Sequence, residues 1–327
     1  MTSRTEAGVD ASWSPAGRTE CGGPPGTGTA ITRKAGMMTD GATLRRRVIG
    51  AALRRYRETL GYPLEDAASI LDCDRSKISR IENGIRAAGL PELRQLLTEY
   101  GAEPADWDIL KVIAGRNAGH GWWDEYADVL PADLRDYLVL ETAAVRVLVY
   151  EPQRIPALLQ TEPYAYALAA ADSALAAGSQ HRAAEAAIIR QQAVLDQGRL
   201  EITAVLGEAA LYQQVGGAAV MGSQLGQLAA FAEDLPQVTV QVLPVSRGAH
   251  AASGSGPAAV LELGGNLGLG VVHLGSLAGD IYLADPAAVA RHASLFPHVQ
   301  TAALPPVASA QVIRDIAAGH RPEPESA

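Results

Sequence analysis

The sequence of 327 residues has only two cysteines, Cys21 and Cys73, and no long apolar run. Two such residues cannot build a disulfide framework or a CxxC metal site. No stretch approaches the roughly 20 apolar residues that a membrane-spanning helix needs, and the first forty residues lack the apolar core of a signal peptide. These absences predict a cytoplasmic protein with no membrane contact.

The common motifs of catalytic and cofactor sites are also missing. There is no GxSxG nucleophile elbow and no HExxH pair, and His250, His273 and His292 do not show helical ligand spacing. The glycine-rich stretch GGNLGLG (264–270) lacks GxGxxG spacing and lies between two predicted strands, which favours a hairpin turn over a phosphate loop. We therefore predict no catalytic residue, no cofactor, no metal ion and no enzymatic activity.

Charge is unevenly distributed along the chain. The net charge is −9, yet residues 44–90 hold ten Lys or Arg against six Asp or Glu. From residue 91 onwards there are 13 basic and 26 acidic side chains. A basic segment on an acidic protein points to a local anionic partner. Chance clustering of arginine is the alternative that charge alone leaves open.

Residues 44–116 have the periodicity of five helices. The first has one apolar face and ends at Gly61; this face consists of Leu44, Val48, Ala52, Leu53, Tyr56 and Leu60. A short second helix begins at Pro63, and a third follows the N-cap Asp74 and ends at Gly84. Between them Asp72 can adopt the left-handed conformation of a tight turn. A fourth helix carries an apolar stripe formed by Leu93, Leu96, Leu97 and Tyr100, and a fifth spans about 105–116.

Two short helices joined by a three- to four-residue turn form a helix-turn-helix unit. The second helix of such a unit enters the major groove of DNA. Ile78 and Ile81 anchor this helix on its neighbours, and the other long or polar side chains point outwards: Arg75, Ser76, Lys77, Ser79 and Arg80. Arg and Lys donate to guanine, and Ser donates or accepts. The sequence therefore predicts binding to double-stranded DNA, with a helix-turn-helix used only for protein contacts as the alternative.

The stretch SKISRIENG (76–84) resembles the recognition-helix signature of the Xre family of helix-turn-helix regulators. By this resemblance, Arg75, Ser76 and Lys77 occupy the base-reading positions. Ser79 would support them from the same helix, together with Arg80.

The resemblance also implies roles outside the base-reading positions. Asn83 and Arg86 would contact phosphates, and Glu82 would make a structural contact inside the domain. Two positions differ from the family pattern. Leu64 stands where the family often has a Gln that touches the DNA backbone, and Asp72 occupies the turn position that is usually Gly.

Beyond residue 120 the period of the apolar residues switches between helical and strand-like. Alternation over two residues predicts strands in LEITAVL (200–206), QVTVQVL (237–243), AAVLEL (258–263) and GLGVVHL (269–274). Gly264-Gly265-Asn266 would join the last two in a hairpin. Helices are predicted around them, one of them capped by Asp285 and kinked or ended by Pro297. For Trp122 and Trp123, packing at a domain joint is favoured over an exposed stacking platform.

These patterns predict an all-α five-helix helix-turn-helix domain over 41–118 and an α+β domain over 119–320. The second domain would contain a four- to five-stranded sheet. Residues 1–40 and 321–327 are expected to be disordered tails.

Several stretches beyond residue 120 resemble the C-terminal domain of an actinobacterial, antitoxin-like (WhiJ-like) group of Xre-type regulators. They are GWWDEYADVLP, YEPQRIPALLQTEPYA, GEAAL, VGGAAVMGSQL and VTVQVLPVSRGAH. The resemblance implies a transcriptional regulator, often working with a small protein encoded by an adjacent gene. The C-terminal domain would bind that partner or a ligand.

We therefore expect a sequence-specific DNA-binding regulator, acting as a homodimer and located at the nucleoid when bound to DNA. One alternative is an antitoxin-like interaction protein that neutralises a small partner and uses DNA binding for autoregulation. Co-purification with that partner would favour it. Another is an enzyme with a DNA-targeting module, which a deep pocket with converging polar groups would favour.

Overall fold

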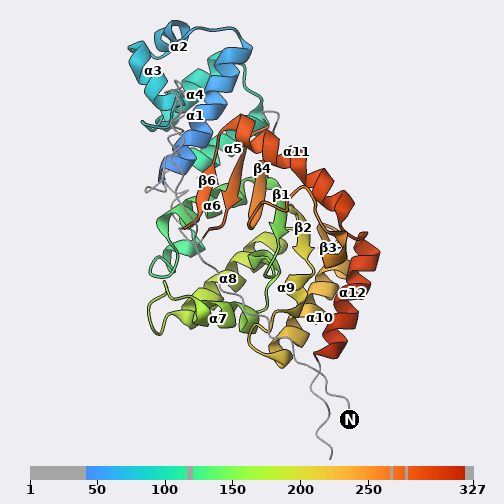
Figure 1. Cartoon of the computed structure of the whole chain (residues 1–327). Helices are drawn as coiled ribbons and strands as arrows, with labels where there is room; N and C mark the ends of the chain where they lie inside the picture. Colours follow the sequence, from blue (N-terminus) through green and yellow to red (C-terminus); the bar gives the residue numbers. More distant parts are fainter. Residues whose placement is uncertain (1–41, 116–120, 266–267, 277–278, 321–327) are drawn as a thin grey trace, which may run out of the picture. The chain divides into compact units, whose positions relative to one another are not determined.

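The N-terminal part of the described structure consists of five helices (Figure 1). The computed structural model describes residues 42–115, 121–265, 268–276 and 279–320. The helices are α1 (Ala42–Thr59), α2 (Leu64–Ile70), α3 (Arg75–Glu82), α4 (Leu90–Glu99) and α5 (Pro104–Ala114). They are the five helices that the periodicity predicts. The tails predicted at 1–40 and 321–327 lie outside the described residues.

The apolar face predicted for α1 forms part of the helical core. Leu44, Val48 and Leu53 are at most 1% exposed and belong to one buried cluster with residues of α3 and α4. Leu60 differs from the prediction, because α1 ends at Thr59 and the Leu60 side chain is 43% exposed. Gly61 then turns the chain with a φ of 69°, a conformation that favours glycine.

The C-terminal part is built on a six-stranded mixed sheet. Its strands are β1 (Ala144–Glu151), β2 (Glu201–Gly207), β3 (Val238–Leu243), β4 (Ala258–Leu263), β5 (Gly270–Leu274) and β6 (Ile281–Leu283). They are ordered β3-β2-β1-β4-β5-β6. The first three pair in parallel, whereas β4, β5 and β6 are antiparallel to their neighbours. This is the predicted α+β fold, and the β4–β5 hairpin is where the sequence places it.

The described sheet has six strands where the sequence predicts four to five, and the strands without a predicted range are β1 and β6. β6 has only three residues. β1 (AVRVLVYE) directly follows a helix and is the central strand, hydrogen-bonded to β2 on one side and β4 on the other. A central strand is covered on both faces and so has an apolar run rather than clean alternation. Such a run cannot be distinguished from a buried helix by its period.

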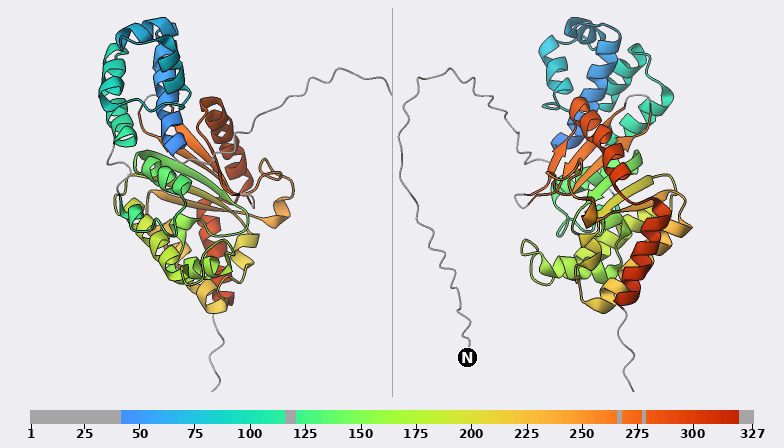
Figure 2. Two further views of the ribbon diagram at one scale, coloured as in Figure 1. Left: turned by 90° about the vertical axis from the view of Figure 1, so that its left-hand side faces the viewer. Right: turned by 45° about the vertical axis from the view of Figure 1, so that its right-hand side comes forward.

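Alternate residues of the central strands face two cores, as the period of two requires. Val147 of β1 and Leu261 of β4 belong to the larger core, whereas their neighbours Leu148 and Val260 belong to a smaller one. Helix α11 (Pro286–Ala302) packs on the smaller core. Residues of α10 (Ala218–Asp234) and α12 (Pro306–Gly319) complete the larger core on the other face (Figure 2).

The remaining helices lie between α5 and β1 or in the connections between the first four strands. They are α6 (Ala132–Thr142), α7 (Glu162–Ala171), α8 (Gln180–Leu195) and α9 (Ala209–Tyr212), with short 3-10 turns η2 (Trp122–Asp124), η3 (Ala157–Leu159) and η4 (Val245–Arg247). Asp285 caps α11 as predicted, because its Oδ1 accepts the Ala288 N–H at 2.9 Å. Pro297 does not end α11, which continues to Ala302. Of the helices described, none is long and apolar enough to cross a membrane.

A buried ion pair fixes α3 against α1. Arg57 Nε lies 2.7 Å from Glu82 Oε1, and Arg57 Nη2 lies 2.8 Å from Glu82 Oε2. The Glu82 side chain is only 4% exposed, and its hydrogen bonds raise the pKa of Arg57. Gly50 lets the helices approach, since a Cβ there would lie 2.5 Å from the Glu82 carbonyl oxygen. Glu82 therefore makes the structural contact that the resemblance implies.

Replacing Glu82 tests this pair. Glu82→Ala should lower the free energy of unfolding by about 3–5 kcal/mol, because Arg57 would stay buried without its partner. Urea denaturation of the full chain, followed by circular dichroism, measures the change. Asp128→Ala is the control, since Asp128 is 54% exposed in its pair with Arg182 and does not touch Arg57 or Glu82, and it should change the free energy of unfolding only slightly. Similar small losses for both variants would contradict a structural role for the buried pair.

Candidate nucleic-acid interface

The turn between α2 and α3 has the geometry that a helix-turn-helix requires. Asp72 has a φ of 46° and is the only non-glycine residue with positive φ in the described part of the chain. The Cys73 N–H donates to the Ala68 carbonyl at 2.9 Å, which closes the turn. Asp74 then caps α3 by accepting the Ser76 N–H at 2.7 Å, and hydrogen bonds from Ser76 lower the pKa of Asp74. The predicted left-handed turn and N-cap are both confirmed.

Packing determines which side of α3 is open to solvent. Ile78 and Ile81 are 1% exposed and lie in the core shared with α1 and α4. Ser76 and Arg80 are exposed on the opposite side, and Ser79 is half-buried. The Arg80 Nε donates to the Ser76 carbonyl at 3.2 Å, so its side chain lies back along the helix.

Arg75 lies at the first position of α3, beside the start of α2. Its side chain is 70% exposed, and its Nη1 lies 3.1 Å from Glu65 Oε1. Leu64, where the family often has Gln, is half-buried and packs on the helical core. The first turn of α2 thus has Glu65, whose carboxylate pairs with Arg75, and it lacks the Gln amide that contacts the DNA backbone in the family pattern.

Lys77 differs from the outward orientation predicted for it. Its Nζ lies 2.7 Å from Glu92 Oε1, and its side chain is only 21% exposed. Glu92 Oε2 accepts the Gly89 N–H at 2.9 Å, so the same carboxylate caps α4. Although burial acts to raise the pKa of Glu92, the bonds from Lys77 and Gly89 and the nearby Arg86 charge hold it below its usual value. Lys77 therefore ties α3 to the start of α4.

The phosphate-contacting residues implied by the resemblance lie just after α3. Asn83 is the C-cap, and its Nδ2 donates to the Ser79 carbonyl at 2.7 Å. Arg86 is half-exposed, and its Nη2 lies 3.6 Å from Glu92 Oε1. Both are at the surface, on the same side of the domain as the end of α3 and the start of α4.

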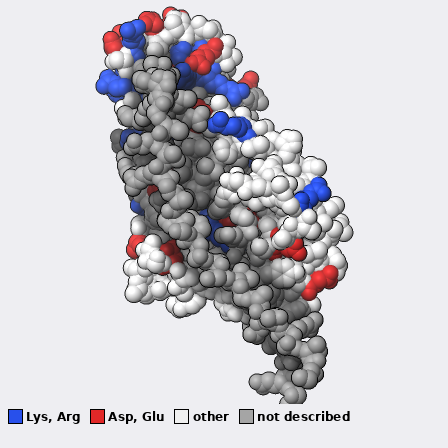
Figure 3. All heavy atoms as spheres, viewed as in Figure 1, with Lys and Arg blue, Asp and Glu red and all other residues white. Residues whose placement is uncertain are grey.

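Acidic side chains alternate with basic ones on this part of the surface. Figure 3 shows Lys and Arg interleaved with Asp and Glu over the N-terminal helices, whereas much of the visible face below is uncharged. Three of the predicted DNA contacts have carboxylate partners in the structure: Arg75 pairs with Glu65, and both Lys77 and Arg86 pair with Glu92. DNA phosphates would therefore have to compete with Glu65 and Glu92 for these cations.

A second group of polar residues lies at the ends of three strands of the sheet. His273 Nε2 lies 3.2 Å from Asp280 Oδ1, and the His273 ring stacks on Tyr282 with a centroid distance of 5.0 Å. The pKa of Asp280 is lowered by His273, while burial raises the pKa of Glu151, at the end of β1, despite its ion pair with Arg154. Sequence spacing could not reveal this group, because its members come from separate elements.

None of the described residues forms a group of three or more His, Cys, Asp or Glu that could hold a metal ion. His273 and Asp280 thus have an ion-pair geometry and no further ligand among these residue types. Thr161, at the N-cap of α7, makes no capping hydrogen bond with its side chain, although its backbone N–H donates to the buried Gln224 at 2.7 Å.

Comparison with known families gives two matches along the chain. Residues 48–108 match a helix-turn-helix domain. Residues 134–315 match a domain of unknown function, DUF5753. Searches of the curated proteins and of the solved structures found no match.

The helix-turn-helix match covers α3 and the turn before it, and it supports a DNA-binding regulator. The second match begins inside α6 and ends inside α12, so it includes the whole sheet. Since this match spans more than half of the 327 residues, the chain belongs to the DUF5753 family and carries a helix-turn-helix domain ahead of the family's domain.

Proposed function

We propose that the chain is an Xre-type transcriptional regulator that binds a specific site on double-stranded DNA with α3. The observation that carries this proposal is the placement of α3, which follows a left-handed turn, is anchored by two buried isoleucines and exposes polar side chains on its other side. An α-helix fits the major groove, where each base pair presents a distinct pattern of donors and acceptors. The buried ion pair between Arg57 and Glu82 and the N-cap Asp74 hold this helix in one orientation.

The proposed roles follow the positions of the side chains. Arg75 and Ser76 at the start of α3 would read base edges, as N-terminal residues of recognition helices do. Lys77 would join them after leaving Glu92, with Ser79 and Arg80 supporting from the next turn. Phosphates would be contacted by Asn83 and Arg86, which lie beyond the end of α3.

We infer that the DUF5753 domain is the regulatory part and not an enzyme. The acidic balance of the chain after residue 91 disfavours DNA lying along it. The WhiJ-like resemblance supports a small protein partner or a ligand, and the antitoxin-like alternative assigns neutralisation of that partner as the main activity. Co-expression with the product of a small adjacent gene, followed by co-purification, would separate a partner from a ligand.

Substitutions on α3 test the reading residues. After selection of a binding site from random DNA, Arg75→Ala should cost about 1–3 kcal/mol and relax base preference at one position if the contact is bidentate. Arg86→Ala should weaken all sequences evenly and reduce the salt dependence. Fluorescence anisotropy at several salt concentrations measures both effects. Arg146→Ala is the control, because Arg146 is an exposed arginine paired with Glu201 and Glu262 on the sheet.

Glu92→Gln tests whether Lys77 is recruited by DNA. The amide can still cap Gly89, but the charge that holds Lys77 and attracts Arg86 is gone. We expect DNA binding to tighten by up to about fivefold, the value of one partly exposed ion pair. Weaker binding of the Glu92→Gln variant, with unchanged thermal stability, would show instead that Lys77 serves only to orient α3.

The full-length protein should bind DNA as a homodimer. One helix-turn-helix contacts few base pairs, so two copies would meet half-sites about 10 base pairs apart, centre to centre. Light scattering of the free protein and footprinting on the selected site test this prediction. A monomer that protects a single half-site would contradict it.

A further inference from the structure

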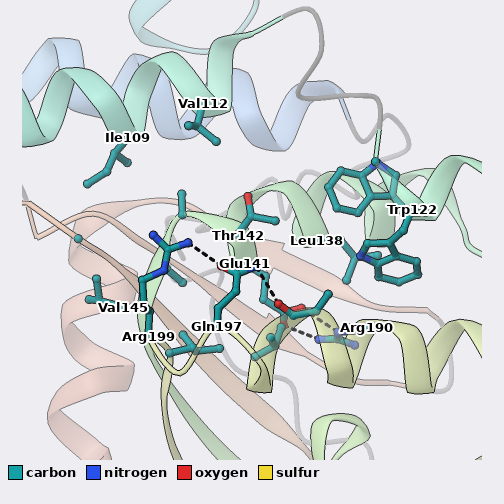
Figure 4. A pocket seen from close by; sticks show the side chains of 18 of the residues that line it. Ile109, Val112, Trp122, Leu138, Glu141, Thr142, Val145, Arg190, Gln197 and Arg199 are labelled. Carbon is teal, nitrogen blue, oxygen red and sulfur yellow. Dashed lines mark hydrogen bonds and ion pairs between the residues drawn. The ribbon is translucent and has the colours of Figure 1, made fainter. Parts of the chain in front are cut away.

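A cavity of about 500 Å³ opens among α5, α6, α8 and the start of β1 (Figure 4). Ile109 and Val112 of α5 form one wall, and Trp122 and Leu138 lie at one end. The other walls come from α8, the residues after it, and β1. This volume is within the range of ligand pockets in proteins.

The lining of this cavity is mainly apolar and only partly covered. Val112 and Val145 are 46% and 47% exposed, although both line the hollow. Trp122 is half-buried and meets Trp123 edge to face at a centroid distance of 5.8 Å. An apolar molecule in the cavity would remove these surfaces from water, which is favourable.

The charged side chains that line the cavity differ in how many hydrogen-bond and ion-pair partners they have within the protein. Glu141 accepts two hydrogen bonds from Arg190, at 2.8 and 2.6 Å, and burial together with Glu141 fixes that guanidinium in place. Arg199 is exposed, donates from Nη2 to Gln197 at 2.6 Å and forms no ion pair with any residue that the structure describes. A guanidinium has five N–H donors, so Arg199 can still bind an acceptor. The other carboxylate of the described lining, Asp108, belongs to α5.

We propose that this cavity binds a small organic anion with an aromatic or otherwise apolar body, its acid group at Arg199, and that the bound anion regulates DNA binding. The regulatory part of this proposal rests on the proposed function. The apolar walls and half-exposed valines would take the body of the ligand. Arg199 is the cation of the lining without a carboxylate partner among described residues, which places the acid group at that end.

The elements around the cavity connect it to the reading helix. Helix α5 packs on α1 and α4, and α1 packs on α3. Helix α6 packs on α1, where Arg45 Nε lies 2.8 Å from Asp136 Oδ1. A ligand that contacts α5, α6 and α8 together would favour one arrangement of these helices, and differential binding is what shifts such an equilibrium.

The aromatic sulfonate 1-anilinonaphthalene-8-sulfonate is a suitable probe, because its fluorescence rises in apolar sites. We expect saturable binding to the full-length protein with a stoichiometry of one per chain. Val112→Trp and Ala193→Trp, which fill the cavity from α5 and α8, should each abolish this binding. Ala290→Trp, at an exposed position of α11, is the matched control and should bind like the parent. Equal binding by all three tryptophan variants, each with an unchanged circular dichroism spectrum, would overturn the site.

A charged probe and an uncharged analogue test whether the cavity prefers anions. Arg199→Gln should weaken binding of the sulfonate by about two- to fivefold, as expected for an exposed ion pair. The same variant should leave binding of N-phenyl-1-naphthylamine unchanged, since this analogue lacks the sulfonate. Equal losses for both probes would show that Arg199 does not select an anion.

The regulatory role is tested with the selected DNA site. The sulfonate should change the Kd for DNA by about 5- to 150-fold, and DNA should change the Kd for the sulfonate by the same factor. DNA binding without the probe tests the proposed function separately. Specific probe binding with an unchanged Kd for DNA would overturn the regulatory role, even if the helix-turn-helix binds DNA as proposed.

Discussion

The ion pair between Arg57 and Glu82 is the interaction on which the position of α3 depends. Two hydrogen bonds under 3 Å join a buried carboxylate to a guanidinium of α1, while Gly50 leaves room for the two helices to touch. A buried pair of this kind adds little net stability over apolar packing, but its bidentate geometry allows one arrangement. Ile78 and Ile81 of α3 contribute the buried apolar surface, and the ion pair determines which side of the helix faces the solvent.

The acidic residues around α3 give this surface a different character from a simple basic patch. Glu65 and Glu92 hold Arg75 and Lys77 in defined places before any DNA arrives. In the proposed binding mode, each of these ion pairs would be replaced by a contact to a base or a phosphate. DNA sequences that offer Arg75 and Lys77 no equivalent acceptor would therefore bind more weakly. Such competition favours discrimination between sites over general attraction to DNA.

The sequence indicates much of the fold because local signals and packing agree there. The five helices, the Asp72 turn, the Asp74 cap and the hairpin all follow from residues close together in the chain. The central strand β1 does not, since burial on both faces removes the alternation. The ion pairs of Lys77 with Glu92 and of His273 with Asp280 cannot be predicted from the sequence either, because periodicity indicates which face of an element a residue occupies and not which side chain it contacts. The cavity near Arg199 is likewise formed by segments distant in sequence.

The order of the strands also determines when the sheet can form. β1 lies between β2, about fifty residues later, and β4, more than a hundred residues later. During synthesis one edge of β1 therefore stays unpaired until residues 258–263 leave the ribosome, and exposed strand edges are sites of aggregation. The N-terminal helices depend on contacts closer in sequence and can assemble earlier. A chain that ends before β4 would thus contain folded N-terminal helices joined to a sheet in which one edge of β1 is unpaired and prone to aggregation.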